Sequence, residues 1–166
     1  KCAGHTGIAG GQFLDLDFEM KKKPFKNIVD MQLKKTGRLF SFCCSVPAII
    51  KNSNNIKINS FKTIGSDIGL LFQIADDLID YKGDAKIAGK PTGRDKSKGK
   101  QTLINFMGYN KTLNFVNNLK KKITINIKKY GIKSYDLIQS VEFILNRKFW
   151  MAKKKLLDKV NYPSDL

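Results

Sequence analysis

Three aspartates stand inside a markedly apolar segment, residues 72–80 (FQIADDLID). On a helix, Gln73, one of Asp76 and Asp77, and Asp80 share one face. Like charges one turn apart destabilise a helix, and buried carboxylates need partners. A divalent cation with oxygen ligands, such as Mg²⁺, is the natural partner. The alternative, a solvated acidic face, fits poorly with the apolar neighbours. The segment therefore predicts a buried helix with Asp76, Asp77 and Asp80 as metal ligands.

The rest of the chain also predicts helices, because helical periods recur and no alternating strand pattern competes with them. Pro24 suits a helix N-terminus and Ser60 an N-cap. Gly65 and Gly69 would let another helix approach closely. The fold class expected is all-α, with one domain over residues 1–166 and an extra tail at 149–166. The helices are expected at residues 12–19, 25–48, 60–81, 102–107, 112–129 and 134–148.

The chain is strongly basic, with a net charge of +17 and only three arginines among its 31 basic residues. Such a charge suits nucleic acid, an anionic membrane surface or a polyanionic substrate such as a diphosphate. A nucleic-acid binder would typically interleave arginines and aromatic residues in one patch. Here the lysines are scattered, so we do not expect nucleic acid as a partner.

Cysteine and histidine usage narrows the chemistry further. Three cysteines, two of them adjacent, indicate free thiols in a reducing compartment. The single histidine, His5, excludes histidine-dependent triads and most zinc sites. No apolar stretch is long enough to span a bilayer. We expect a cytoplasmic protein, or one in a plastid or mitochondrion if a targeting segment was removed.

Two glycine-containing motifs and one lysine-rich loop add candidate substrate contacts. The loop at residues 82–99 carries Gly89-Lys90 and ends beside Lys100, which suits phosphate binding; an ordinary solvated loop is the alternative. Thr and Gly are poor residues inside a helix, so residues 35–37 (KTG) predict a bend that turns Lys35 and Thr36 inward. Near the N-terminus, Gly10 and Gly11 precede Gln12 and Asp15, which share a helical face.

The order of these motifs is more specific than any one of them. GGQxxDL at residue 10, KT at 35, FQxxDDxxD at 72 and GKxxGxDxxxGK at 89 occur in succession. This succession resembles the C-terminal half of trans-polyprenyl diphosphate synthases, in particular the bacterial enzymes that make farnesyl or geranylgeranyl diphosphate. The likeness covers residues 4–148.

The resemblance implies a bundle of antiparallel helices around a deep cavity and, for the full-length protein, a homodimer. It also implies Mg²⁺-dependent, head-to-tail condensation of isopentenyl diphosphate with an allylic diphosphate, either dimethylallyl or geranyl diphosphate. Asp76 would bind Mg²⁺ directly, Asp80 directly or through water, and Asp77 would support or orient them. The lysines implied at the allylic diphosphate are Lys35, Lys90 and Lys100.

Other roles implied by the resemblance concern the reacting carbon. Thr36 and Gln73 would lie beside it, where oxygen dipoles stabilise a carbocation. Phe72 would contact isopentenyl diphosphate or the cavity wall, and Gln12 and Asp15 would line the site from a neighbouring helix. The catalytic group implied is Lys35, Thr36, Gln73 and Asp76.

The chain departs from the family pattern in what it lacks. The family's first aspartate-rich motif, the arginine pair near it and the upstream basic residues that hold isopentenyl diphosphate have no counterpart here, so we expect the chain alone to be incomplete for catalysis. A non-catalytic partner subunit of a prenyl synthase is the main alternative, and a basic protein that binds nucleic acid or membrane surfaces is a weaker one. Cyclising relatives share aspartate-rich motifs, but Lys35-Thr36 and Gly89-Lys90 favour chain elongation.

Overall fold

The computed structural model describes residues 2–82 and 100–146. Within these ranges all regular structure is helical and no strand occurs, which confirms the all-α prediction. The elements are α1 (Ile8–Asp17), α2 (Phe25–Gln32), the π-helical turn η1 (Leu33–Gly37), α3 (Arg38–Ile50), α4 (Asn55–Lys82), α7 (Leu103–Met107), α8 (Tyr109–Lys128), the 3-10 turn η2 (Ile132–Ser134) and α9 (Tyr135–Leu145).

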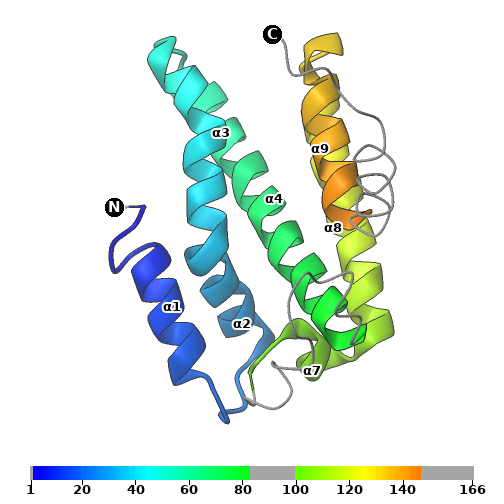
Figure 1. Ribbon diagram of the computed structural model, residues 1–166. Coiled ribbons are helices and arrows are strands. Elements are labelled where there is room, and N and C mark those ends of the chain that lie inside the picture. The colour runs from blue at the N-terminus through cyan, green and yellow to red at the C-terminus, as the bar shows by residue number, and fades with distance from the viewer. Residues whose placement is uncertain (1, 83–99, 147–166) are drawn as a thin grey trace, which may run out of the picture.

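Helix α4 is the centre of the arrangement (Figure 1). On one side it packs against α3 and η1, and on the other against α8 and α9. Helix α1 lies at the outer edge beside α2 and η1, and short α7 lies near the lower end of α4. None of the helices in the described ranges is both long and apolar enough to cross a bilayer.

The core lies where α4, α8 and α9 meet. On α4 the buried apolar residues recur every three or four positions, which gives one continuous apolar stripe. Burying one such side chain contributes about 1.5–3 kcal/mol. The buried members of this cluster on the three helices are Ile64, Ile68, Leu70, Leu71, Ile74, Ala75 and Leu78 on α4, Val116, Leu119, Ile123 and Ile127 on α8, and Val141 and Ile144 on α9.

Most helices occur where the sequence predicts them, and their ends differ for identifiable reasons. Pro24 directly precedes α2, as expected. The Ser60 cap is wrong: α4 begins at Asn55, because the Asn54 side chain accepts a hydrogen bond from the Lys57 N–H at 2.9 Å. The Ser60 hydroxyl instead accepts from the Tyr130 hydroxyl at 2.9 Å. The connection between α3 and α4 is therefore shorter than the expected helix bounds, 25–48 and 60–81, imply.

The C-terminal helices show similar shifts. A positive φ of 82° at Gly108 separates α7 from α8, so α8 begins at Tyr109 and not at residue 112. The described part of the last helix ends at Leu145, and residues 147–166, with the predicted tail, lie outside the described residues.

Glycines on α4 allow the close approach that the sequence predicts. A Cβ at Gly65 would lie 2.4 Å from the Phe40 carbonyl oxygen, and one at Gly69 would lie 2.7 Å from the Gly37 Cα. Real Cβ atoms do not come so close to backbone atoms. Side chains larger than glycine would therefore force α4 away from α3 and η1.

Candidate active site

One stripe along α4 changes from small to polar toward its lower end. Gly65, Gly69, Gln73 and Asp77 follow one another at intervals of four residues, so they share a helix face. The two glycines bring α4 into backbone contact with the opposite helix. Gln73 and Asp77, further along α4, lie at hydrogen-bonding distance from η1 and α2. The glycines thus set the helix spacing that the polar contacts require.

These contacts form a chain of hydrogen bonds, which we call the polar seam: Gln32, Thr36, Gln73 and Asp77. The Thr36 hydroxyl donates to Gln73 Oε1 at 3.0 Å. Gln73 Nε2 donates to Asp77 Oδ1 at 3.0 Å, and Gln32 Nε2 donates to Asp77 Oδ2 at 2.9 Å. The structure therefore brings the predicted residues Thr36, Gln73 and Asp77 together.

The π-helical turn η1 lies where the sequence predicts an irregular helix. Such turns interrupt α-helices and are frequent at functional sites. Adjacent residues diverge here: Thr36 bonds to Gln73 on α4, whereas Lys35 turns to α1. One short turn thus supplies a hydroxyl to one neighbouring helix and an ammonium group to the other.

Lys35 and Asp15 form an ion pair between η1 and α1. Lys35 Nζ lies 2.6 Å from Asp15 Oδ2, and Asp15 is buried. Helix α1 can approach this closely because residue 11 is glycine. A Cβ there would lie 2.1 Å from the Lys35 backbone nitrogen. The ammonium group has three protons, so two remain for other acceptors. The prediction that Lys35 turns inward is consistent with this pairing.

The three aspartates occupy the lower part of α4, and their environments differ. Asp77 is 6% exposed and Asp80 5% exposed, while Asp76 is partly exposed. Asp76 and Asp80 are four residues apart and share a face, whereas the carboxylate oxygens of Asp77 accept hydrogen bonds from Gln73 and Gln32. The two amide donors to Asp77 fit the orienting role inferred for it, and its role as a direct ligand stays a prediction.

Mg²⁺ is the metal that the sequence suggests, and the donor set of this end of α4 can be tested against it. Within residues 2–82 and 100–146, no group of three or more His, Cys, Asp or Glu side chains comes together as a complete metal cage. Mg²⁺ does not need one, because one or two carboxylates, waters and substrate phosphates commonly hold it. Asp76 and Asp80, two hard oxygen donors on one face, fit that requirement.

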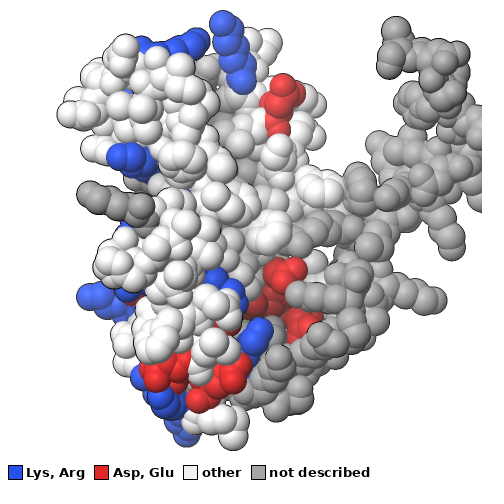
Figure 2. All heavy atoms as spheres, turned by 60° about the vertical axis from the view of Figure 1, so that its left-hand side comes forward, with Lys and Arg blue, Asp and Glu red and all other residues white. Residues whose placement is uncertain are grey.

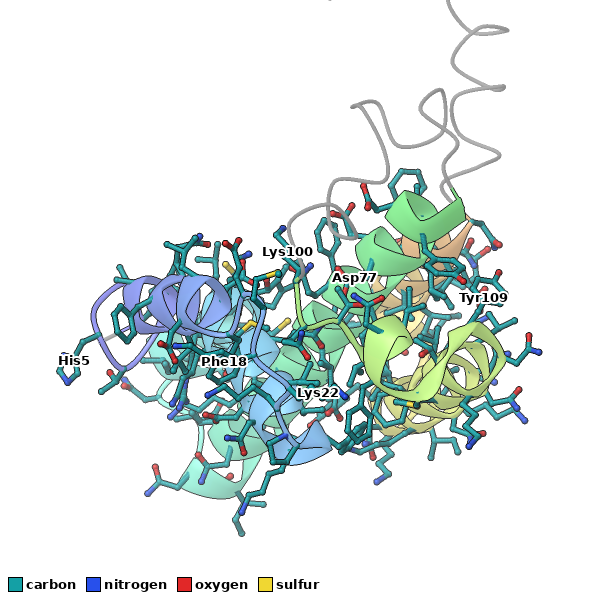
Figure 3. The ribbon with its side chains drawn as sticks, turned by 90° about the horizontal axis from the view of Figure 1, so that it is seen from below. His5, Phe18, Lys22, Asp77, Lys100 and Tyr109 are labelled. Carbon is teal, nitrogen blue, oxygen red and sulfur yellow. The ribbon has the colours of Figure 1, made fainter. Side chains whose placement is uncertain are left out.

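The remaining predicted residues divide into described and undescribed ones. Phe72 is partly buried, with its ring 5.5 Å from that of Phe40, and Gln12 is exposed on α1. Seen from below, Asp77 and Lys100 both lie toward the middle of the bundle end, whereas His5 lies at its outer edge (Figure 3). Lys90 and the loop at residues 83–99 lie outside the described residues.

Surface charge gives no sign of one basic patch on the face that Figure 2 displays. Acidic side chains gather mainly in the lower half of this face, and basic side chains are scattered over both halves. A binding surface for a nucleic-acid backbone would instead concentrate positive charge along a groove or stripe.

The cysteines are free, as their number and spacing predict. Cys43 is exposed and Cys44 is partly buried. Burial raises the pKa of the Cys44 thiol, and neighbouring Cys43 raises it further. Cys44 is therefore a neutral thiol at physiological pH and makes a poor nucleophile.

One residue of the polar seam that was not predicted from the sequence is Gln32. Its side chain is almost fully buried and bonds to Asp77. The one available signal was a polar residue at a position where the helical period of residues 25–48 expects an apolar one.

Comparison with known proteins identifies relatives of this chain. Residues 4–135 match the polyprenyl synthetase family. A short chain isoprenyl diphosphate synthase from Methanocaldococcus jannaschii is 32% identical over 82% of this chain and 41% of its own length. A farnesyl diphosphate synthase from Micrococcus luteus is 33% identical over 64% of this chain and 36% of its own length.

Solved structures agree with the fold. An FPP/GFPP synthase from Zymomonas mobilis superposes with a TM-score of 0.72 at 32% identity, over 86% of this chain and 47% of that one. The chain spans between about a third and a half of the length of the curated relatives that it matches, 36% and 41% for the two named above. With four-fifths of its residues inside the family match and the same helical architecture, the chain belongs to the polyprenyl synthetase family.

Proposed function

We propose that the full-length protein containing this chain is a Mg²⁺-dependent prenyltransferase. It condenses isopentenyl diphosphate head-to-tail with an allylic diphosphate, dimethylallyl or geranyl, to give a short-chain prenyl diphosphate. The observation that carries the proposal is the polar seam, which joins Thr36, Gln73 and Asp77 next to Asp76 and Asp80 on α4. Membership of a family whose matched relatives are named as farnesyl and isoprenyl diphosphate synthases supports it.

In this proposal the end of α4 holds the metal. Asp76 and Asp80 provide oxygen ligands, and Asp77 keeps the end of the helix in register through its amide donors. Bound Mg²⁺ neutralises the charge that develops on the diphosphate leaving group. The buried surroundings of Asp77 and Asp80 strengthen electrostatic interactions by excluding water.

Lys35 is proposed to contact the allylic diphosphate. Asp15 holds its ammonium group at 2.6 Å from one side, which fixes its position. The remaining N–H donors are then directed by the protein and need not reorganise when phosphate oxygens arrive. Lys90 and Lys100 are proposed as further cationic contacts.

Thr36 and Gln73 are proposed to stabilise the allylic cation with their oxygen atoms. The Thr36 hydroxyl proton is engaged by Gln73 Oε1, so the lone pairs of Thr36 Oγ1 remain to face positive charge. Gln73 is fixed at both ends of its amide, by Thr36 and by Asp77. Fixed dipoles of this kind stabilise developing charge without paying for reorganisation during the reaction.

A non-catalytic partner subunit is the competing function. It would not need Asp77 and Asp80, each at most 6% exposed, since buried carboxylates are costly without a role. We place the reaction in a reducing compartment such as the cytoplasm, because the three cysteines are free.

The test is a condensation assay on the full-length protein with isopentenyl diphosphate and either dimethylallyl or geranyl diphosphate. We expect an elongated prenyl diphosphate in the presence of Mg²⁺ and no product after treatment with EDTA. Absence of product with every allylic diphosphate, combined with stimulation of a separate synthase in a mixing experiment, would replace the proposal by the partner-subunit function.

A further inference from the structure

Gln32 is the last residue of α2 and directly precedes the π-helical turn. Its side chain is 2% exposed, and Nε2 donates a hydrogen bond to Asp77 Oδ2 at 2.9 Å. The two residues are 45 positions apart in the sequence, so the contact exists only in the folded bundle. It connects α2, which leads directly into the turn η1 that carries Thr36, to α4, which carries the aspartates.

The orientation of the Gln32 amide follows from its partner. A carboxylate only accepts hydrogen bonds, so the NH2 group must face Asp77 and Oε1 must point elsewhere. In the part of the chain that the structure describes, Oε1 is buried and has no hydrogen-bond donor. A buried acceptor without a donor lowers stability. Packing alone would be served better by an apolar side chain of similar shape, such as methionine.

Asp77 receives one amide N–H on each carboxylate oxygen, from Gln73 and from Gln32. Both donors are neutral, so they fix the direction of the carboxylate without cancelling its charge. Gln73 belongs to the same helix as Asp77, and therefore cannot fix that helix against its neighbours through this bond. Of these two donors, only Gln32 ties the aspartate-bearing turn of α4 to the opposite helix.

We propose that Gln32 is a positioning residue of the metal site and acts through Asp77. It holds the end of α4 so that Asp76 and Asp80 present their carboxylates for Mg²⁺ and a diphosphate. This inference deepens the proposed function and rests on it. Outer residues that orient the ligands of a metal commonly affect metal affinity or activity by about 10- to 100-fold.

The experiment uses calorimetric titration of the full-length protein with Mg²⁺ in the presence of inorganic diphosphate. We expect Gln32→Met to weaken Mg²⁺ binding by about 10- to 100-fold, because its thioether cannot donate to Asp77. Thermal unfolding in EDTA should change by only a few degrees, since methionine fills the same space and removes the buried unpaired oxygen. Met31→Leu, a change at the adjacent buried position, is the matched control and should bind Mg²⁺ like the wild type.

A double-mutant cycle shows whether Gln32 acts through Asp77. In an Asp77→Ala background, adding Gln32→Met should weaken binding by less than about twofold, because the two changes remove one interaction. A full, additive loss in that background would overturn the inference. If Gln32→Met fails to unfold cooperatively, the isosteric Gln32→Glu replaces it, and the same loss of Mg²⁺ affinity is expected from a carboxylate facing Asp77.

The outcomes separate the two levels of the proposal. Unchanged Mg²⁺ affinity in Gln32→Met or Gln32→Glu, with clear binding by the wild type, overturns the role of Gln32 and leaves the proposed function standing. No Mg²⁺ binding by the wild type in the presence of diphosphate overturns both. Weakened binding in Gln32→Met with normal binding in Met31→Leu supports the inference.

Discussion

On one side, α4 meets α8 and α9 through aliphatic side chains, and on the other it meets α2 and η1 through the polar seam. The apolar side includes Leu71 and Ile74, which are fully buried. The polar side carries glycines where the helices touch and then Gln73 and Asp77 where they hydrogen-bond. The same 28-residue helix thus has one face suited to stability and one suited to chemistry.

Because the two sides differ in this way, loss of folding can be separated from loss of function. Apolar contacts are individually strong and tolerant of direction, so changes there should act on the free energy of unfolding. Hydrogen bonds contribute little net stability but define direction, so changes in the polar seam should act mainly on the site.

Among these changes, Ile123→Ala, on the apolar side, should have the largest effect on stability. Ile123 is fully buried on α8, so its truncation should lower the free energy of unfolding by about 2–5 kcal/mol. Ile125→Ala on the same helix is the matched control, because Ile125 is 62% exposed; it should change stability by less than about 0.5 kcal/mol. Urea denaturation measures both, and equal losses would contradict the assignment of the core.

Gly69→Ala tests the contact that sets the helix spacing. The new Cβ would lie 2.7 Å from the Gly37 Cα, so α4 and η1 must separate. We expect a stability loss of about 1–3 kcal/mol, as for other overpacking changes, together with weaker Mg²⁺ binding in the presence of diphosphate. Gly4→Ala, whose Cβ would meet no atom within 4 Å, serves as the control. A fully stable Gly69→Ala protein would show that close approach is not required.

Thr36→Val should separate the effect of a hydrogen bond in the polar seam from the effect of side-chain volume. It keeps the volume but removes the donor to Gln73 Oε1. The expected stability loss is about 0.5–1.5 kcal/mol, and turnover should fall by roughly tenfold because Gln73 is no longer held at both ends. Thr63→Val on α4 is the control, since Thr63 is exposed and its hydroxyl donates to the Asn59 carbonyl of its own helix. Steady-state kinetics measures turnover in both variants. An equal loss of turnover in the two would refute the role of the Thr36 hydrogen bond in holding Gln73.

Lys120→Met should have the smallest effect on stability. Lys120 and Glu142 form an ion pair of 2.6 Å between α8 and α9, but both side chains are partly exposed. Such pairs contribute less than about 1 kcal/mol. Thermal unfolding at low and high salt measures the effect, and a loss comparable to that of Ile123→Ala would mean that charge pairing, and not apolar burial, holds α8 against α9.

Local patterns predicted much of this arrangement. Period and spacing identified the long helices, the irregular turn at residues 35–37 and the face shared by Gln73 and the aspartates. The close approach at Gly65 and Gly69 also followed from glycine spacing alone. These features depend on residues within a few turns of one another, which a sequence displays directly.

Contacts between distant segments were not predictable in this way. The bond between Gln32 and Asp77 depends on the register of α2 against α4, which many side chains and the Gly37–Gly69 contact determine together. The start of α4 was missed because Asn54 and Ser60 are both good caps, and the choice depends on the bond between Ser60 and Tyr130. Tertiary contacts decided between locally acceptable alternatives.

The most direct test of the account compares two aspartates of α4 in the condensation assay. Asp76 is proposed to bind Mg²⁺, whereas Asp67 lies 2.8 Å from Lys122 in an ion pair with α8. In the full-length protein, Asp76→Ala should lower turnover by about 10²- to 10⁴-fold, the scale of a lost metal contribution, while Asp67→Ala should retain turnover close to that of the wild type. Normal condensation by a folded Asp76→Ala protein would contradict the metal site on α4.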